Sequence, residues 1–305
     1  MKKFILKGCC FLLPFLIFGI YLEYGLSKYP NSYMTKKNDI SQNLQNIEVL
    51  ILGTSHALNG LNPRFFSQKT FNLANASQSI YYDKALLDLY IDKLPKLKTV
   101  ILSVSYFSFW YQLEGSTEDW RKYFYYQFFN IPNKSINELE SKAWAKTILY
   151  SPKKTLDIAL QNFKAEENKF YYQGWNGTDT TSMNISISDT KQRIDFHHSI
   201  MMEENIRQNT KYIHEITTKL QKNNIRVIII YMPVYETYYE QMLPKYTNIN
   251  DNIIRKLTSQ YQISYYNYSK NHNYNRLDFH NSDHLSFIGA EKFSKLVDSL
   301  IIQTK

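Results

Sequence analysis

Short apolar segments alternate with segments of helical periodicity, and this alternation constrains the fold more than any other feature of the sequence. Strands are predicted where apolar and β-branched residues follow one another, at residues 47–52, 70–73, 99–103, 226–231 and 263–266. Continuous apolar strands are typical of a parallel sheet that is buried on both faces. We therefore expect an α/β domain in which a mostly parallel sheet lies between two layers of helices.

Four segments between and after these strands have the apolar spacing of amphipathic helices. They lie at about residues 80–94, 204–223, 250–261 and 287–302. Residues 107–205 are crowded with tyrosine, phenylalanine and tryptophan and show no such alternation, so we interpret them as an insertion. The aromatic residues of this insertion predict either a platform on which sugars stack or the packed core of the insertion itself.

A long apolar segment near the N-terminus predicts a membrane helix. Residues 4–22 are apolar apart from Lys7, and a helix of this length can just cross a hydrocarbon core of about 30 Å. We therefore expect residues 1–25 to form a transmembrane anchor. A signal peptide cleaved near Gly25-Leu-Ser27 is the alternative. Lysines flank both ends of the segment, so their distribution does not fix its orientation.

The polar residues 26–45 are expected to form a linker to one globular domain at residues 46–305.

The rest of the composition excludes several classes of protein. Cys9 and Cys10 are the only cysteines and lie in the apolar segment, so the domain has no disulfide framework, cysteine-zinc site or cysteine nucleophile. The net charge is +9, but the basic residues form no block, and we expect no nucleic-acid partner.

Two loops carry residues that can perform acyl chemistry. The first strand ends in Gly53-Thr-Ser-His56, and the loop before the last helix contains Asp283 and His284. Reactive groups of an open parallel sheet gather beyond the carboxyl ends of its strands. A serine hydroxyl needs a base to remove its proton, and imidazole serves near neutral pH. We expect Ser55 to be the nucleophile and His284 its base, with Gly53 allowing the tight turn. The alternative is that Ser55 only caps a helix.

The combination of a strand, Gly-x-Ser, and a C-terminal Asp-His-Leu-x-x-x-Gly-Ala resembles the SGNH (GDSL-like) hydrolase superfamily. The likeness covers about residues 45–110 and 205–305. It is nearest to membrane-anchored branches that act on cell-envelope polymers, such as the alginate-acetylation proteins and DltD-like proteins. The resemblance implies a three-layer α/β/α fold with a flavodoxin-like sheet, a catalytic domain outside the cytoplasm, and no cofactor.

The sequence departs from the family pattern at the acid. Asn281 stands where the family has an acid three residues before the histidine, and Asp283 directly precedes His284. Thr54 replaces the usual Asp of the first block, which other envelope branches tolerate. We expect Asp283 to matter more than Asn281, because a carboxylate can stabilise the imidazolium that forms during the reaction. Asn281 is the alternative group that orients the imidazole.

Oxyanion donors and substrate contacts are less well defined by the sequence. Residues 72–79 resemble the second block, with Asn75 and Ser77 as candidate donors and Ser77 at the position of the family glycine; Gly53 is a further candidate. Residues 103–106 resemble the third block but lack its Asn, which leaves Ser105. Candidate substrate contacts are His56, Tyr106, Trp175 and Tyr235. Residues 195–198, Asp-Phe-His-His, lack the spacing of metal ligands, so we expect a polar loop and no metal site.

The sequence thus predicts a serine-dependent acyl-ester hydrolase or O-acetyltransferase that acts on a cell-surface polysaccharide. Its expected partners are the membrane, through the N-terminal helix, an acylated glycan, and a membrane-bound acyltransferase. A catalytically inactive SGNH-like subunit that binds glycan or positions an acyltransferase is the first alternative, because the family acid and Asn donor are missing. A lipid esterase that faces the cytoplasm is the second.

Overall fold

A computed structural model of the protein describes residues 1–164, 169–177, 185–270 and 272–303. The chain divides into two compact units. One contains Met1–Lys37 and Trp120–Asn168, and the other contains Asn38–Asp119 and Lys169–Lys305. The expected insertion at residues 107–205 is therefore not one body, because its central part joins the N-terminal helix and its two flanks belong to the unit with the sheet.

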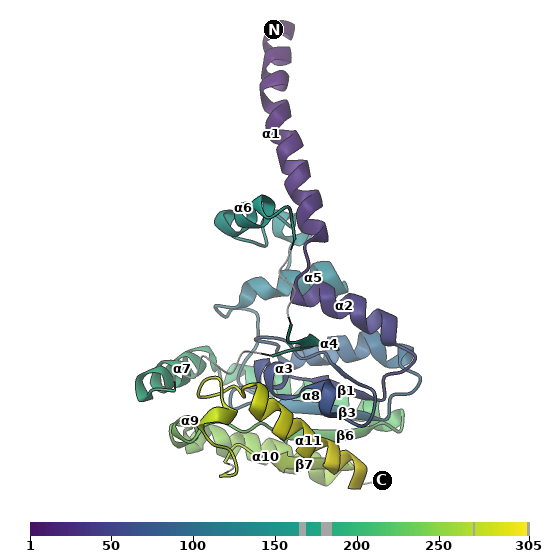
Figure 1. The fold of residues 1–305 in the computed structure, drawn as a ribbon, viewed down its shortest axis with the longest axis vertical. Helices are drawn as coiled ribbons and strands as arrows, with labels where there is room; N and C mark the ends of the chain where they lie inside the picture. The colour runs from purple at the N-terminus through teal and green to yellow at the C-terminus, as the bar shows by residue number, and fades with distance from the viewer. Residues whose placement is uncertain (165–168, 178–184, 271, 304–305) are drawn as a thin grey trace. The chain divides into compact units, whose positions relative to one another are not determined.

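The second unit is built on a five-stranded parallel sheet (Figure 1). Its strands are β1 (Val49–Leu52), β2 (Thr70–Asn72), β3 (Thr99–Val104), β6 (Arg226–Tyr231) and β7 (Ile263–Asn267), in the order β2-β1-β3-β6-β7. This is the flavodoxin-like order, so the predicted fold class is confirmed. All five predicted strands are present within three residues of their expected ends. The order reverses between β1 and β3, and ligands of such sheets bind at this switch point.

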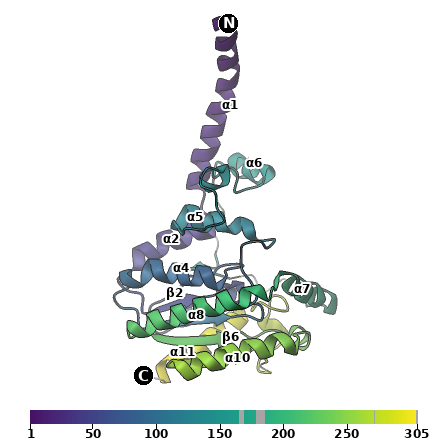
Figure 2. The same ribbon diagram turned by 180° about the vertical axis from the view of Figure 1, so that it is seen from behind.

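Helices cover both faces of the sheet, as the continuous burial of β1 and β3 requires. One face carries α4 (Ile80–Tyr90), α8 (Glu204–Lys222) and α10 (Pro244–Gln260), and the other carries α3 (Ser55–Gly60) and α11 (Phe287–Gln303) (Figures 1 and 2). Helix α10 begins earlier than the expected residue 250, because Pro244 in its first turn is already preset for helical geometry.

The second unit also contains shorter elements. These are α7 (Ile187–Ile200), α9 (Glu236–Glu240), the hairpin of β4 (Tyr171–Tyr172) and β5 (Trp175–Asn176), and 3₁₀ turns at Pro63–Phe65, Ile91–Lys93, Asp119–Arg121 and Arg276–Asp278. The third of these turns runs on into the first unit. The expected polar loop at residues 195–198 is part of helix α7, which Ser186 caps by accepting the N–H of Asp189 at 3.0 Å.

The first unit contains α1 (Lys2–Lys28), the first half of α2 (Ser32–Asn43), α5 (Lys122–Phe129), a 3₁₀ turn at Ser141–Ala143 and α6 (Pro152–Leu160). Helix α1 is long and apolar enough to cross a membrane, with a mean hydropathy of 2.1 over its most apolar window. A signal sequence has the same length and composition, so this property alone does not decide between the two expectations.

The expected linker at residues 26–45 is mostly helical. Helix α1 continues to Lys28 and α2 begins at Ser32. The Asn31 carboxamide accepts the N–H groups of Tyr33 and Met34, both at 3.0 Å, and so supplies an N-cap that the polar composition concealed. Tyr33 is buried with its ring centroid 5.0 Å from that of Phe124, which fixes the start of α2 within the first unit.

Candidate active site

The turn between β1 and α3 presents Ser55 at the switch point of the sheet. Gly53 has a φ of +137°, and a Cβ added there would lie 2.8 Å from the carbonyl oxygen of Ser103, so the turn requires glycine. Thr54 is the N-cap of α3, because its hydroxyl accepts the N–H of His56 at 3.3 Å. Ser55 is therefore not the cap, and its hydroxyl is available for another contact.

That contact is the imidazole of His284, although the two residues lie 229 positions apart. The Ser55 hydroxyl donates to His284 Nε2 across 2.8 Å. This direction places the imidazole proton on Nδ1, and Nδ1–H then donates to Asn281 Oδ1 at 3.0 Å. The arrangement is that of a hydroxyl, a base and a group that orients the base, which is the geometry for activating a serine.

The Asn281 carboxamide and the Asp283 carboxylate both approach His284 Nδ1. Asn281 Oδ1 also accepts the backbone N–H groups of Asp283 at 3.2 Å and His284 at 2.9 Å, so it organises the loop as well as the ring. Asp283 Oδ1 lies 3.1 Å from the same nitrogen but has no partner in hydrogen-bond geometry among the described residues. Asn281 is thus the hydrogen-bonding orienter, and Asp283 acts on the ring through its charge.

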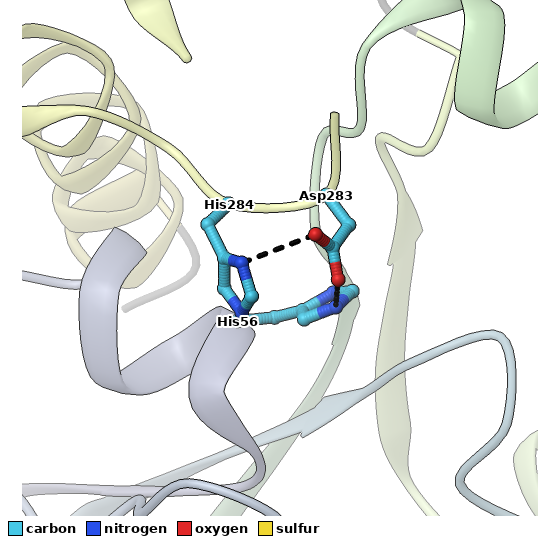
Figure 3. Close-up of side chains that lie close together, drawn as sticks. All are labelled: His56, Asp283 and His284. Carbon is cyan, nitrogen blue, oxygen red and sulfur yellow. Dashed lines mark hydrogen bonds and ion pairs between the residues drawn. The ribbon is translucent and has the colours of Figure 1, made fainter. Parts of the chain in front are cut away.

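Asp283 is the centre of a buried charged network. Its Oδ2 accepts from Arg193 Nε at 2.8 Å and contacts His56 Nε2 at 3.2 Å, with His197 Nε2 at 3.7 Å. Figure 3 shows the carboxylate between the rings of His284 and His56. Burial alone would raise the pKa of the Asp283 carboxyl, but the neighbouring His284 imidazole and the Arg193 guanidinium hold that pKa well below its usual range. The network therefore keeps a carboxylate anion beside the imidazole.

His284 is itself nearly buried, and its protonation follows from that. Burial lowers the pKa of His284 to about 4, although the charge of Asp283 opposes this shift, and Arg193 lowers the pKa further. The imidazole is consequently neutral at neutral pH, which is the form that can accept a proton from Ser55.

Arg193→Gln is expected to raise the pKa of His284, because the guanidinium charge both disfavours the imidazolium and neutralises Asp283. An NMR titration of the histidine ring protons should place the His284 midpoint near pH 4 in the natural protein and well above it in the variant. Lys191→Gln, on the same helix but exposed and paired with Asp195 at 2.6 Å, is the matched control. An unchanged midpoint in Arg193→Gln would contradict this account of the network.

His56, Asp283 and His284 could also be considered as metal ligands, since one donor atom of each lies within 4.8 Å of the others. However, Asp283 Oδ2 already accepts from the Arg193 guanidinium, and His284 Nε2 accepts from Ser55. A cation at this carboxylate would be repelled by the guanidinium. The donors are thus arranged to hold one another, and they fit a hydrogen-bonded catalytic group better than a metal site.

Two of the expected oxyanion donors are engaged elsewhere. The Gly53 N–H donates to the buried Asp83 carboxylate. The Ser105 N–H donates to Ser108 Oγ at 2.8 Å, and its hydroxyl lies 2.9 Å from Thr54 Oγ1. Gly53 and Ser105 therefore shape the turn that carries Ser55.

Asn75 and Ser77 lie in a turn that contacts the turn carrying Ser55. The Asn75 N–H donates to the Gly53 carbonyl at 3.2 Å, and the Gln78 N–H closes the turn on the Asn75 carbonyl at 3.2 Å. Ser77 has a φ of +53°, a left-handed conformation that glycine adopts without steric cost. The Asn75 side-chain nitrogen makes no hydrogen bond within the described part of the chain, so this amide remains a candidate oxyanion donor in the turn that contacts Gly53.

Comparison with known proteins finds likeness in solved structures alone. No family model and no curated protein matches the chain. A Bacteroides fragilis protein named as an acylhydrolase superposes with a TM-score of 0.43 at 12% identity, covering 89% of this chain and 95% of its own. A GDSL-like lipase from Bacteroides thetaiotaomicron gives a TM-score of 0.45 at 11% sequence identity. The match covers 90% of this chain and 100% of the lipase. A Streptococcus pneumonia protein named for platelet activating factor gives a TM-score of 0.43 at 12% sequence identity. The match covers 92% of this chain and 96% of that protein.

The features that the resemblance implied are present in the molecule itself: a flavodoxin-like sheet, a serine after the first strand, and a histidine loop before the last helix. What these residues do is a separate question, which the geometry of Ser55 and His284 addresses.

Sequence reasoning did not assign Arg193, His197, Tyr238 or Asp83 to the site. Arg193 and His197 both come from α7, and their spacing of four places them on one face of that helix. His197 Nδ1 lies 2.5 Å from the hydroxyl of the buried Tyr238, which completes the far side of the network. Asp83 supports the nucleophile turn, and burial raises its pKa to about 7 while hydrogen bonds from Gln78 and Gly53 lower it. The i,i+4 pair Arg193/His197 was the only signal in the sequence.

Three of the four expected substrate contacts are buried. His56 is 3% exposed and bound to Asp283. Tyr106 is 1% exposed, accepts the Leu243 N–H at 2.9 Å and contacts His198 at 3.0 Å. Trp175 is fully buried, and its indole donates to the Asn59 carbonyl at 2.8 Å. These side chains present no face to a substrate, and Tyr106 and Trp175 take the packing role that was the alternative.

Tyr235, the fourth expected contact, lines a groove of about 900 Å³ beyond the carboxyl ends of β6 and β7. Tyr239, Tyr274 and Asp251 also line it, so aromatic faces stand beside polar groups. The Tyr235 N–H donates to the Ser282 carbonyl at 2.9 Å, and its ring centroid lies 5.5 Å from that of Phe279. The groove wall is thus continuous with the loop that carries Asp283 and His284, although Ser55 does not line it.

Proposed function

We propose that the protein is a serine-dependent acyl-ester hydrolase or O-acyltransferase. The observation that carries this proposal is the 2.8 Å contact between Ser55 Oγ and His284 Nε2, with Nδ1 held by Asn281. An isolated serine–histidine contact can be fortuitous, but here the neutral imidazole also faces a buried carboxylate that can stabilise its charged form.

The reaction begins when Ser55 Oγ attacks the acyl carbonyl carbon and its proton passes to His284 Nε2. The tetrahedral oxyanion is stabilised by the Ser55 N–H, one of the first N–H groups of α3, and by the Asn75 amide. Collapse breaks the bond to the alcohol oxygen, which takes the proton from His284 and leaves an acyl-Ser55 ester. Water or a sugar hydroxyl then attacks this ester and gives its proton to His284. Collapse of the second tetrahedral intermediate breaks the bond between the acyl carbon and Ser55 Oγ, which takes the proton back from His284, and the free acid or the acylated sugar leaves.

The proposed substrate is an acylated glycan of the cell surface. The groove beside the Asp283–His284 loop supports this choice, since tyrosine faces and carboxylate or amide groups are suited to sugar rings and their hydroxyls. The apolar helix α1 supports a membrane-anchored chain with its catalytic unit outside the cytoplasm, where a membrane-bound acyltransferase could supply the acyl group. The choice between water and sugar as acceptor decides between esterase and transferase.

Fluorophosphonate labelling of the purified full-length protein tests the nucleophile. We expect the natural protein to be labelled at Ser55, identified by peptide mass, and Ser55→Ala to remain unlabelled. Ser259→Ala, which removes an exposed helical hydroxyl bonded only to the Lys256 carbonyl, should be labelled normally. A folded natural protein that takes no label at Ser55 would refute the enzyme and favour the inactive glycan-binding subunit.

A further inference from the structure

The first unit exposes large apolar side chains outside α1. Trp144 is 64% exposed, Leu156 52% and Leu160 74%, with Ile148 between them at 44%. All four lie in residues 144–163, which we call the α6 segment. Large apolar groups gathered on one short segment mark a surface that contacts another apolar phase.

Helix α6 (Pro152–Leu160) presents Leu156 and Leu160 on one face. Lys153, Leu156 and Leu160 follow the i, i+3, i+7 spacing of a single helical face and are exposed. Thr155 and Ile158 lie on the opposite face and are buried in the unit. The helix thus buries Thr155 and Ile158 and turns two leucines outward, beside the exposed side chains of Lys153 and Asp157.

Both ends of the α6 segment are fixed to the last turns of α1. The Glu23 carboxylate accepts the N–H groups of Lys146 at 2.6 Å and Thr147 at 3.0 Å. At the other end the Phe163 ring packs on Tyr21, with the two ring centroids 5.3 Å apart. The same ring lies so close to Gly25 that a Cβ added to this glycine would clash with it. Helix α6 lies beside the C-terminal part of α1 in both views (Figures 1 and 2).

These contacts set the depth of the segment relative to a bilayer. The apolar run of α1 covers residues 4–22, so Tyr21, Glu23 and Gly25 lie where a spanning helix leaves the hydrocarbon core. The α6 segment is tied at the level of the lipid headgroups. Tryptophan is enriched at this depth, because its ring is apolar and its N–H can bond to water or headgroups.

The charge of the segment fits an anionic lipid surface. The α6 segment carries three lysines, Lys146, Lys153 and Lys154, against one carboxylate, Asp157, and one further lysine flanks it on each side. Each basic residue close to an anionic leaflet contributes about 1 kcal/mol of attraction. An amphipathic helix with leucines on one face and lysines beside them is typical of helices that lie in the plane of the interface.

We propose that the α6 segment is a second membrane contact, in which Trp144, Leu156 and Leu160 enter the headgroup region of an anionic bilayer. The lysines bind the lipid phosphates, and the contact fixes the orientation of the first unit on the membrane. The proposal requires α1 to be in the bilayer but is independent of any catalytic activity.

Brominated lipids, which quench tryptophan by contact, test this in the full-length protein reconstituted in vesicles of phosphatidylcholine with phosphatidylglycerol. Helix α1 has no tryptophan, so any quenching reports other segments. We expect Trp144→Phe to remove most of the lipid quenching. Trp120→Phe, which removes another exposed tryptophan of the same unit outside the segment, should retain it.

The charge is tested by Lys153→Gln with Lys154→Gln, two exposed positions whose change should leave the fold intact, as circular dichroism can check. We expect this pair to reduce quenching in the anionic vesicles more than in vesicles of phosphatidylcholine alone. Quenching that is equal in the natural protein and Trp144→Phe would overturn the proposal. If the natural protein and the double lysine variant are each quenched equally in the two kinds of vesicle, the proposed binding of the lysines to anionic lipid would be wrong.

Discussion

Ser55→Ala is expected to lower the turnover of a small acetyl ester by about 10⁴-fold or more, with the fold unchanged. The side chain contributes a hydroxyl to a single contact, with His284 Nε2, and alanine is well tolerated at the start of a helix. Loss of activity therefore reports the missing nucleophile and not unfolding. Purified natural and variant proteins should be compared by initial rates, with thermal unfolding as the check on structure.

His284→Ala should cost a similar factor, and the double variant should be no worse than either single one. The two groups act as a unit, because the base has no proton to remove once the serine is gone. Additive losses would mean that Ser55 and His284 act in separate steps. Ser259→Ala serves again as the control, and a well-folded Ser55→Ala with natural turnover would exclude Ser55 as the nucleophile.

The sheet and the serine–histidine contact could be predicted because both have local signals. The apolar and β-branched residues at 47–52 and 99–103 predicted strands buried on both faces, and β1 and β3 are buried along their whole length. Once the strands are parallel, their carboxyl ends share one edge, and the turn at Ser55 can meet a loop that returns there before the last helix. Residues 229 positions apart were thus brought together by topology and not by any pairwise signal.

The Arg193 side of the site could not be predicted in the same way. Helix α7 lies in a region without strand–helix alternation, and the approach of Arg193 to Asp283 depends on how that helix packs. Likewise, the polar composition of residues 26–45 indicated a linker, because the burial of Tyr33 depends on its contact with Phe124 of α5, which lies far along the chain. Tertiary contacts of this kind override local composition.

Asp283→Asn is expected to lower turnover by about 10² to 10⁴-fold, the upper value being the cost of the same change in serine proteases. Asparagine has the same shape and can still accept from Arg193 or His56, but the negative charge is lost. Because the charge of Asp283 raises the pKa of His284, its removal lowers that pKa further and makes the imidazole a weaker base. The imidazolium formed in the reaction would also lie beside Arg193 without compensation.

Asn281→Ala provides the comparison that separates charge from orientation. It removes the hydrogen-bond acceptor of His284 Nδ1 and two backbone contacts, but leaves the carboxylate in place. We expect a smaller loss of turnover than in Asp283→Asn, because Asp283 Oδ1 lies 3.1 Å from the same nitrogen and can take over as acceptor. Both variants need a measurement of folding stability. Breaking a buried charge pair lowers the free energy of unfolding by about 3–5 kcal/mol. We expect a smaller loss for the pair of Asp283 with Arg193, because the Arg193 side chain is partly exposed.

The order of the two losses decides which group takes the place of the family acid. If folded Asp283→Asn retains full activity, the carboxylate serves the structure of the network alone, and Asn281 runs the reaction as the sole orienter. Asn281→Asp then becomes informative, because it restores a carboxylate at the family position. A gain in turnover in Asn281→Asp would show that the natural protein lacks a carboxylate at the position where the family has its acid. A loss would show that two carboxylates cannot share the imidazole, and that Asp283 already supplies the charge.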